Sequence, residues 1–127
     1  MFTFGGRKSC ARTGSELRTK FCLVRHGSTD WNVEERIQGC TDTALNQRGR
    51  EEVAVLADRL QGQDWEFIIT SNLQRAQETG MIIGEVLHLP VFTYPNLRER
   101  KFGPLEGLSF AEIREKYPEG IGELSLP

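Results

Sequence analysis

Four residues in this sequence have side chains that could together handle a phosphoryl group: Arg25, His26, Arg75 and Glu99. A pair of guanidinium groups can bind a phosphoryl group through paired hydrogen bonds. A neutral imidazole can attack phosphorus and form a covalent intermediate, which replaces one difficult displacement by two easier ones. A protonated carboxyl group beside the bound ester can then donate its proton to the leaving oxygen. The four residues lie far apart in the sequence, so this chemistry depends on the fold.

The elements that must position these residues alternate along the chain. Segments typical of buried strands and segments with helical spacing of apolar residues follow one another: strands at residues 21–26, 67–71 and 91–94, and helices at residues 47–60, 73–87 and 110–117. Ser71 or Asn72 can cap the second helix, and Ser109 can cap the third. This order predicts an α/β fold with three layers and a mainly parallel sheet with crossover helices.

The candidate chemical residues come at corresponding places in this order. Arg25 and His26 end the first strand, Arg75 lies in the first turn of the helix after the second, and Glu99 follows the third. The carboxyl ends of parallel strands share one edge, where α/β sheets bind ligands. We therefore expect the four side chains to meet there. The N-terminus of the helix that contains Arg75 is expected to add backbone N–H donors for an anion.

Composition narrows the classes of function. The 127 residues suffice for one modest domain, and a net charge of −2 gives no basic footprint for nucleic acid. No apolar run is long enough to cross a membrane. The three cysteines form neither a disulfide framework nor a metal motif, which favours a reducing, cytoplasmic location and no metal. The sequence carries no signal for an oligomeric state.

The N-terminal segment differs from the rest of the chain. Residues 1–19 are rich in Gly, Ser, Thr and Arg, with a single acidic residue and no periodic apolar face. We expect a flexible extension there. An alternative is a short organelle transit peptide, because such peptides are basic and poor in acidic residues. The catalytic domain is then expected to begin at residue 20 and to occupy residues 20–127.

Four motifs in this order resemble the histidine phosphatase superfamily, in its phosphoglycerate-mutase-like branch. They are LVRHGSTDWN at residues 23–32, IQGCTDTALNQRG at 37–49, ITSNLQRAQET at 69–79 and LRE followed by FGPLEG within 97–107. The resemblance implies that His26 is the nucleophile, which becomes a phosphohistidine, and that Glu99 is the proton donor. It further implies that Arg25 and Arg75 clamp the phosphoryl group, with no metal or organic cofactor.

The same resemblance assigns a substrate pocket and a reaction. It implies that Asn32, Gln38 and Gly39 contact a small phosphorylated substrate. Glycolytic mutases of the family typically carry Gly-Trp in the first loop and a His-Tyr pair after Glu-Arg, whereas this chain has Gly39-Cys40 and Lys101-Phe102. We therefore expect a phosphatase that hydrolyses a small phosphomonoester. Phosphoglycerate mutase-type phosphoryl transfer is the alternative.

One family feature has no counterpart among the motifs. The family uses a second catalytic histidine in a Ser-His-Gly-like turn after a later strand. The other histidine of this chain is His88, which is expected at the end of a helix before Glu99 and so cannot take that role. We expect the chain to be incomplete at the C-terminus relative to the family. A further alternative is therefore a catalytically impaired fragment that acts as a binding or regulatory module.

Overall fold

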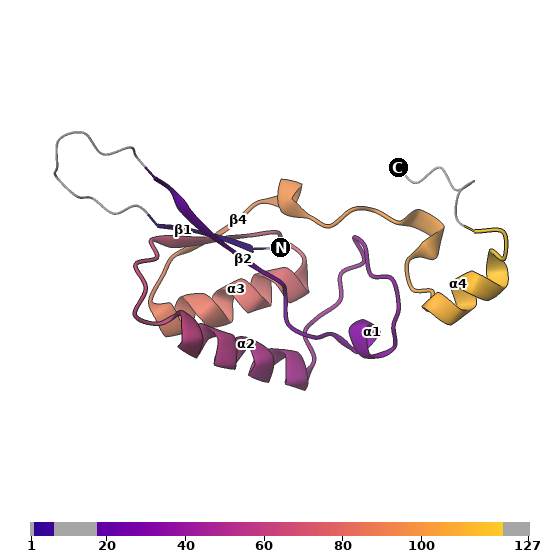
Figure 1. Ribbon diagram of the computed structural model, residues 1–127, viewed down its shortest axis with the longest axis horizontal. Coiled ribbons are helices and arrows are strands. Elements are labelled where there is room, and N and C mark those ends of the chain that lie inside the picture. The colour runs from indigo at the N-terminus through magenta and orange to yellow at the C-terminus, as the bar shows by residue number, and fades with distance from the viewer. Residues whose placement is uncertain (1, 7–17, 121–127) are drawn as a thin grey trace.

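The computed structural model describes residues 2–6 and 18–120, and residues 2–6 are described by their backbone alone (Figure 1). Strands and helices alternate, so the expected α/β class is confirmed. The elements are β1 (Phe2–Gly6), β2 (Lys20–Val24), α1 (Asp30–Val33), α2 (Gln47–Leu60), β3 (Phe67–Thr70), α3 (Gln74–Leu87), β4 (Val91–Thr93), two 3-10 turns (Pro95–Leu97 and Gly103–Leu105) and α4 (Phe110–Lys116). None of the described helices is long and apolar enough to cross a membrane.

The sheet contains a strand that the sequence did not predict. The strand order of the sheet is β2-β1-β3-β4. The unpredicted strand, β1, runs antiparallel to both neighbours, with Phe4 opposite Cys22 on one side and Ile68 on the other. Residues 2–6 are therefore part of the sheet, so the expected flexible extension is wrong for them, and residues 7–17 lie outside the described residues. The pairing of β3 with β4 is parallel, as the sequence predicts, and the two pairings of β1 are antiparallel.

Despite this insertion, the strand directions that the site requires are retained. Since β2 and β3 are each antiparallel to β1, they are parallel to one another, and β4 is parallel to β3. Their carboxyl ends therefore lie at one edge of the sheet. The residues that follow β2, β3 and β4 leave the sheet at this edge, as the sequence predicts.

The described part of the chain forms two of the three expected layers. The helices α2 and α3 lie side by side on one face of the sheet (Figure 1). Alternate residues of a strand point to opposite faces, so Val24 faces these helices and is buried, whereas Phe21 and Leu23 are 63% and 62% exposed on the other face. No described helix covers that second face.

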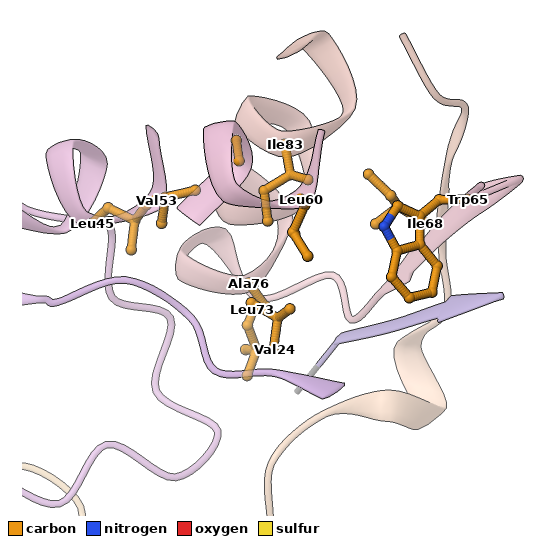
Figure 2. Close-up of a cluster of buried hydrophobic side chains, with 10 residues drawn as sticks. Val24, Leu45, Val53, Leu60, Trp65, Ile68, Leu73, Ala76 and Ile83 are labelled. Atoms are coloured by element: carbon orange, nitrogen blue, oxygen red, sulfur yellow. The ribbon is translucent and has the colours of Figure 1, made fainter. Parts of the chain in front are cut away.

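The core lies between the sheet and the two helices. Val24 and Ile68 of the strands pack with a stripe of apolar side chains on α2 and α3, which includes Val53, Leu60, Ala76 and Ile83 (Figure 2) and also Ala57. The stripe on α2 recurs at helical spacing, and this helix has the predicted bounds. Asn46 caps it by accepting a 2.8 Å hydrogen bond from the backbone N–H of Gly49.

The last helix packs against the loop that contains α1. Ser109 caps α4 as predicted and forms a reciprocal capping box with Glu112. Backbone hydrogen bonds join Ile37 to Leu108 (3.0 Å) and Gly107 to Ile37 (2.8 Å). Figure 1 shows α1 and α4 at the same end of the molecule, beyond the carboxyl ends of β2 and β3.

Candidate active site

The imidazole of His26 is held in one tautomer. Its Nδ1 lies 2.8 Å from the carbonyl oxygen of Gly27, and a carbonyl only accepts hydrogen bonds. Nδ1 therefore carries the proton and donates it, which leaves a lone pair on Nε2. Burial lowers the pKa of His26, the bond to Gly27 opposes this, and the charges of Arg75 and Arg25 lower the pKa further, so it falls below 6.5. The ring is thus neutral and nucleophilic at neutral pH.

The loop after His26 is fixed against α2 and α3. The N–H of Gly27 donates to the hydroxyl of Thr79 (3.2 Å), which in turn donates to the carbonyl of Arg75 (2.7 Å). The N–H of Asn46 donates to the carbonyl of Ser28 (3.0 Å). A Cβ atom at Gly27 would lie closer than 3.0 Å to the start of α2, so only glycine permits this approach.

The guanidinium of Arg75 is buried and oriented by backbone carbonyls. The residue is 2% exposed. Its Nη2 donates to the carbonyl of Gly39 (2.7 Å) and its Nη1 to that of Thr41 (2.8 Å). Burial lowers the pKa of Arg75, while the charge of Glu99 raises it in opposition. Arg75 is therefore within electrostatic reach of both His26 and Glu99, and the fold brings these three candidates together.

The first turn of α3 is closed to an anion, which corrects the expectation from the sequence. Neither Ser71 nor Asn72 is the cap, because Leu73 occupies that position without a side-chain bond. Instead, the N–H of Gln74 donates to the carboxylate of Asp42 (2.6 Å), and the N–H of Arg75 donates to the carbonyl of Thr43 (3.1 Å). These backbone donors bind the loop before α2 and are not available to a phosphoryl group.

Glu99 and Arg25 lie at the exposed side of the site. The carboxylate of Glu99 accepts a 2.9 Å hydrogen bond from the N–H of Arg100, and its backbone carbonyl accepts one from the thiol of Cys40 (2.9 Å). Arg25 is exposed, and its charge acts on His26. Arg75 is thus buried, whereas Glu99 and Arg25 are accessible.

The expected pocket residues take part in hydrogen bonds within the loops. The Oδ1 of Asn32 accepts from the N–H (3.0 Å) and the hydroxyl (2.9 Å) of Thr29. The Oε1 of Gln38 lies within hydrogen-bond distance of the hydroxyls of Thr29 and Thr43, and this residue is 9% exposed. Gly39 is buried and offers its carbonyl to Arg75. Their contact with a substrate stays a prediction.

Three residues that hold the site were not predicted from the sequence: Asp42, Thr79 and Glu106. Their partners lie between 4 and 66 positions away in the sequence. The carboxylate of Glu106 accepts hydrogen bonds from Thr41, Phe102 and Cys40, which outweigh the effect of its desolvation and lower its pKa. The sequence offered one signal for Glu106, its place in the glycine-containing segment FGPLEG. A carboxylate beside tight turns can accept hydrogen bonds from backbone N–H groups.

His88 lies at the opposite end of α3 from Arg75. It ends the helix in a left-handed conformation, with a φ of 55°. It lies thirteen positions after Arg75, which corresponds to about 20 Å along a helix at 1.5 Å per residue. His88 therefore does not face the site. The described residues include no cluster of three His, Cys, Asp or Glu that could hold a metal ion.

Two hollows lie away from these residues. One of about 510 Å³ is lined by Met81 and Val91, and one of about 370 Å³ is lined by Trp65 and His88. Neither is lined by His26, Arg75 or Glu99. The candidate site is therefore identified by the chemistry of its side chains and not by the size of a cavity.

A histidine with a free Nε2, a buried arginine and a carboxylate at the carboxyl edge of an α/β sheet define a class of proteins that handle phosphoryl groups through histidine. The sequence model of the histidine phosphatase superfamily (branch 1) matches residues 21–125. The chain belongs to this superfamily.

Individual relatives have phosphatase and mutase-like names. The chain is 41% identical over 103 residues to the uncharacterized phosphatase PhoE of Bacillus subtilis (strain 168), which covers 81% of this chain and 53% of that protein. It is 41% identical over 105 residues to phosphoglycerate mutase-like protein 4 of Arabidopsis thaliana, which covers 81% and 46%. A solved mycobacterial glucosyl-3-phosphoglycerate phosphatase in complex with VO3 is similar with a TM-score of 0.70 and 36% identity, over 75% of this chain and 47% of that one. The chain spans about half the length of these relatives.

Proposed function

We propose that this chain carries the nucleophile and phosphate-binding part of a phosphatase that hydrolyses a small phosphomonoester through a phosphohistidine at His26. The observation that carries the proposal is the hydrogen bond from Nδ1 of His26 to the carbonyl of Gly27. It leaves the Nε2 lone pair free, and the lowered pKa keeps the ring neutral. The phosphatase names of two of the relatives support the reaction type.

The proposed reaction has two balanced steps. In the first, Arg25 and Arg75 bind the phosphoryl oxygens, Nε2 of His26 attacks phosphorus, and the bond to the ester oxygen breaks. The leaving oxygen takes a proton from the carboxyl group of Glu99. In the second, water attacks the phosphohistidine and gives its proton to Glu99, which releases phosphate and regenerates Nε2. Each step is assigned to side chains of the chain and uses neither a metal nor an organic cofactor.

The pocket is proposed to receive a small phosphorylated substrate, with Asn32, Gln38 and Gly39 beside it. Phosphoryl transfer of the phosphoglycerate mutase type is the second candidate, which the name of the Arabidopsis relative favours. The two reactions are distinguished by their products. A mutase depends on a bisphosphorylated primer and releases little free phosphate, whereas a phosphatase releases phosphate without a primer.

The third candidate is a module that binds phosphate without turnover. The distance between His88 and Arg75 favours it, because the described residues place no second imidazole at the site. We propose weak turnover by this chain alone, since a missing donor to the phosphoryl group typically costs about 2.7–4 kcal/mol of transition-state stabilisation.

The free thiols of Cys22 and Cys40 support a reducing, cytoplasmic location.

The test is to trap the covalent intermediate. The 127-residue chain is incubated with p-nitrophenyl phosphate, and the acid-labile phosphohistidine is detected by ³¹P NMR and mass spectrometry. We expect the label on His26, its loss in His26→Ala and its retention in the matched control His88→Ala. Label or turnover in His26→Ala equal to that of the unmodified chain contradicts the mechanism. Binding of inorganic phosphate without any label identifies the binding module instead.

A further inference from the structure

The carboxylate of Glu106 joins two loops that are far apart in the sequence. Its Oε1 accepts hydrogen bonds from the backbone N–H of Phe102 (2.9 Å) and from that of Cys40 (3.2 Å). Its Oε2 accepts from the hydroxyl of Thr41 (2.6 Å). The carboxylate thus fixes the turn at residues 39–41 against the segment 99–106, which contains Glu99.

The turn at residues 39–41 is built to receive this carboxylate. Gly39 has a φ of +53°, a conformation that L side chains rarely adopt. A Cβ atom at this position would lie closer than 3.0 Å to Oε1 and Cδ of Glu106. The absence of a side chain at residue 39 therefore allows Glu106 to approach the backbone, and the N–H groups of the turn point at it.

The same turn contacts Arg75 and Glu99, two of the candidates for phosphoryl chemistry. The carbonyls of Gly39 and Thr41 accept from Nη2 and Nη1 of Arg75. The thiol of Cys40 donates to the backbone carbonyl of Glu99. N–H groups and a hydroxyl on one side of the turn bind Glu106, while carbonyls on the other side bind Arg75. A displacement of the turn would therefore move the guanidinium and the backbone of Glu99 together.

We propose that Glu106 is a positioning residue for the reaction: it holds the turn at residues 39–41 so that Arg75 and Glu99 are placed beside His26. This inference rests on the proposed function, since it assigns the phosphoryl group to Arg75. Glu106 itself acts through the turn, because its carboxylate accepts hydrogen bonds from Cys40, Thr41 and Phe102. Catalytic side chains depend on such supporting contacts because small displacements reduce their effect strongly.

The first measurement needs no substrate and no turnover. In the full chain, ¹⁵N NMR reports the guanidinium of Arg75, whose two carbonyl bonds slow its rotation and give separate Nη signals. We expect Glu106→Ala to average these signals and to speed hydrogen exchange at the N–H groups of Cys40 and Phe102. Glu112→Ala is the matched control, because Glu112 also accepts a backbone hydrogen bond (Ser109, 2.7 Å) but lies outside the turn.

The second measurement uses orthovanadate as a phosphate analogue. We expect Glu106→Ala to weaken its binding by about tenfold or more, and Glu112→Ala to leave it unchanged. Thr41→Val removes one of the three bonds to Glu106 and is expected to change the Arg75 signals and the affinity in the same direction but less. This variant decides the question if Glu106→Ala fails to fold.

The outcomes separate this inference from the proposed function. Unchanged Arg75 signals and orthovanadate affinity in Glu106→Ala and Thr41→Val overturn the positioning role. An equal change in Glu112→Ala also overturns it, because the effect would then be a general loosening of the fold. If the unmodified chain forms no phosphohistidine while its Arg75 signals still depend on Glu106, the proposed hydrolysis is contradicted and the positioning role is supported.

Discussion

The hydroxyl of Thr79 accepts a 3.2 Å hydrogen bond from the backbone N–H of Gly27, the residue that follows the candidate nucleophile. Thr79 is fully buried, and its hydroxyl donates to the carbonyl of Arg75 one helical turn earlier. One side chain of α3 thus connects the loop of His26 to the helix that carries the candidate phosphate-binding arginine. The register between these two elements depends on this hydroxyl.

Replacement of Thr79 by Val should leave the Gly27 N–H buried without an acceptor. Val has nearly the same shape but no hydroxyl, so we expect a loss of about 1–3 kcal/mol in the free energy of unfolding. Urea denaturation measures the loss, and hydrogen exchange at Gly27 should become faster. Thr79→Ser keeps the hydroxyl and should preserve the slow exchange at Gly27. Equally slow exchange in Thr79→Val would contradict the assigned bond.

A second prediction compares two glycines with nearly the same backbone conformation. Gly39 and Gly103 have φ values of +53° and +52°, but a Cβ atom would collide with Glu106 only at Gly39 and would meet nothing within 4 Å at Gly103. Both Ala variants are expected to lose about 1–2 kcal/mol from the left-handed conformation. We expect Gly39→Ala to lose about 1–3 kcal/mol more from overpacking, as measured by urea denaturation.

A double-mutant cycle identifies the source of this difference. In the Glu106→Ala background the collision partner is absent, so the additional loss at Gly39 should shrink towards that at Gly103. An additional loss that persists in this background would mean that the neighbouring backbone, and not Glu106, causes it.

Local patterns in the sequence were sufficient for much of the fold. The apolar spacing of Val53, Ala57 and Leu60 predicted α2 with its observed bounds, and Ser109 predicted the start of α4. The placement of His26, Arg75 and Glu99 at the same edge followed from the order of strands and helices. These features depend on neighbours within one helix or strand, which the sequence displays directly.

Features that depend on distant partners were not predicted. Asp42 rather than Ser71 closes the first turn of α3, and the two partners Asp42 and Gln74 are 32 positions apart. The strand β1 is recognised only by its pairing with β2 and β3, because its five residues end in two glycines and show no periodic pattern. The exposed second face of the sheet could not be predicted either, since apolar strand residues read as buried whether or not a layer covers them.

The position of β1 between β2 and β3 leads to a third prediction. Position 4 lies opposite Cys22 on one side and Ile68 on the other. Proline at this position fixes φ and removes a backbone donor in the middle of a sheet. We expect Phe4→Pro to lower the melting temperature and to promote self-association through the unpaired strands, as size-exclusion chromatography would detect. Phe4→Ala controls for the side chain, and equal behaviour of the two variants would show that β1 does not hold the sheet together.

The lowered pKa of His26 leads to a pH dependence of stability whose sign is fixed. Because the folded state binds the imidazole proton less readily than the unfolded state, the unfolded state carries more protons as the pH falls below 6.5. The contribution of His26 to the free energy of unfolding should therefore be fully present above pH 6.5. It should decline as the pH falls from 6.5 to the lower pKa of the folded state. His26→Asn should remove this part of the decline. Replacing His88 by Asn leaves His26 as the only imidazole, so that its Cε1–H signal can be titrated by NMR. A midpoint at or above 6.5 would mean that His26 is partly charged at neutral pH, and the neutral nucleophile on which the proposed mechanism depends would be lost.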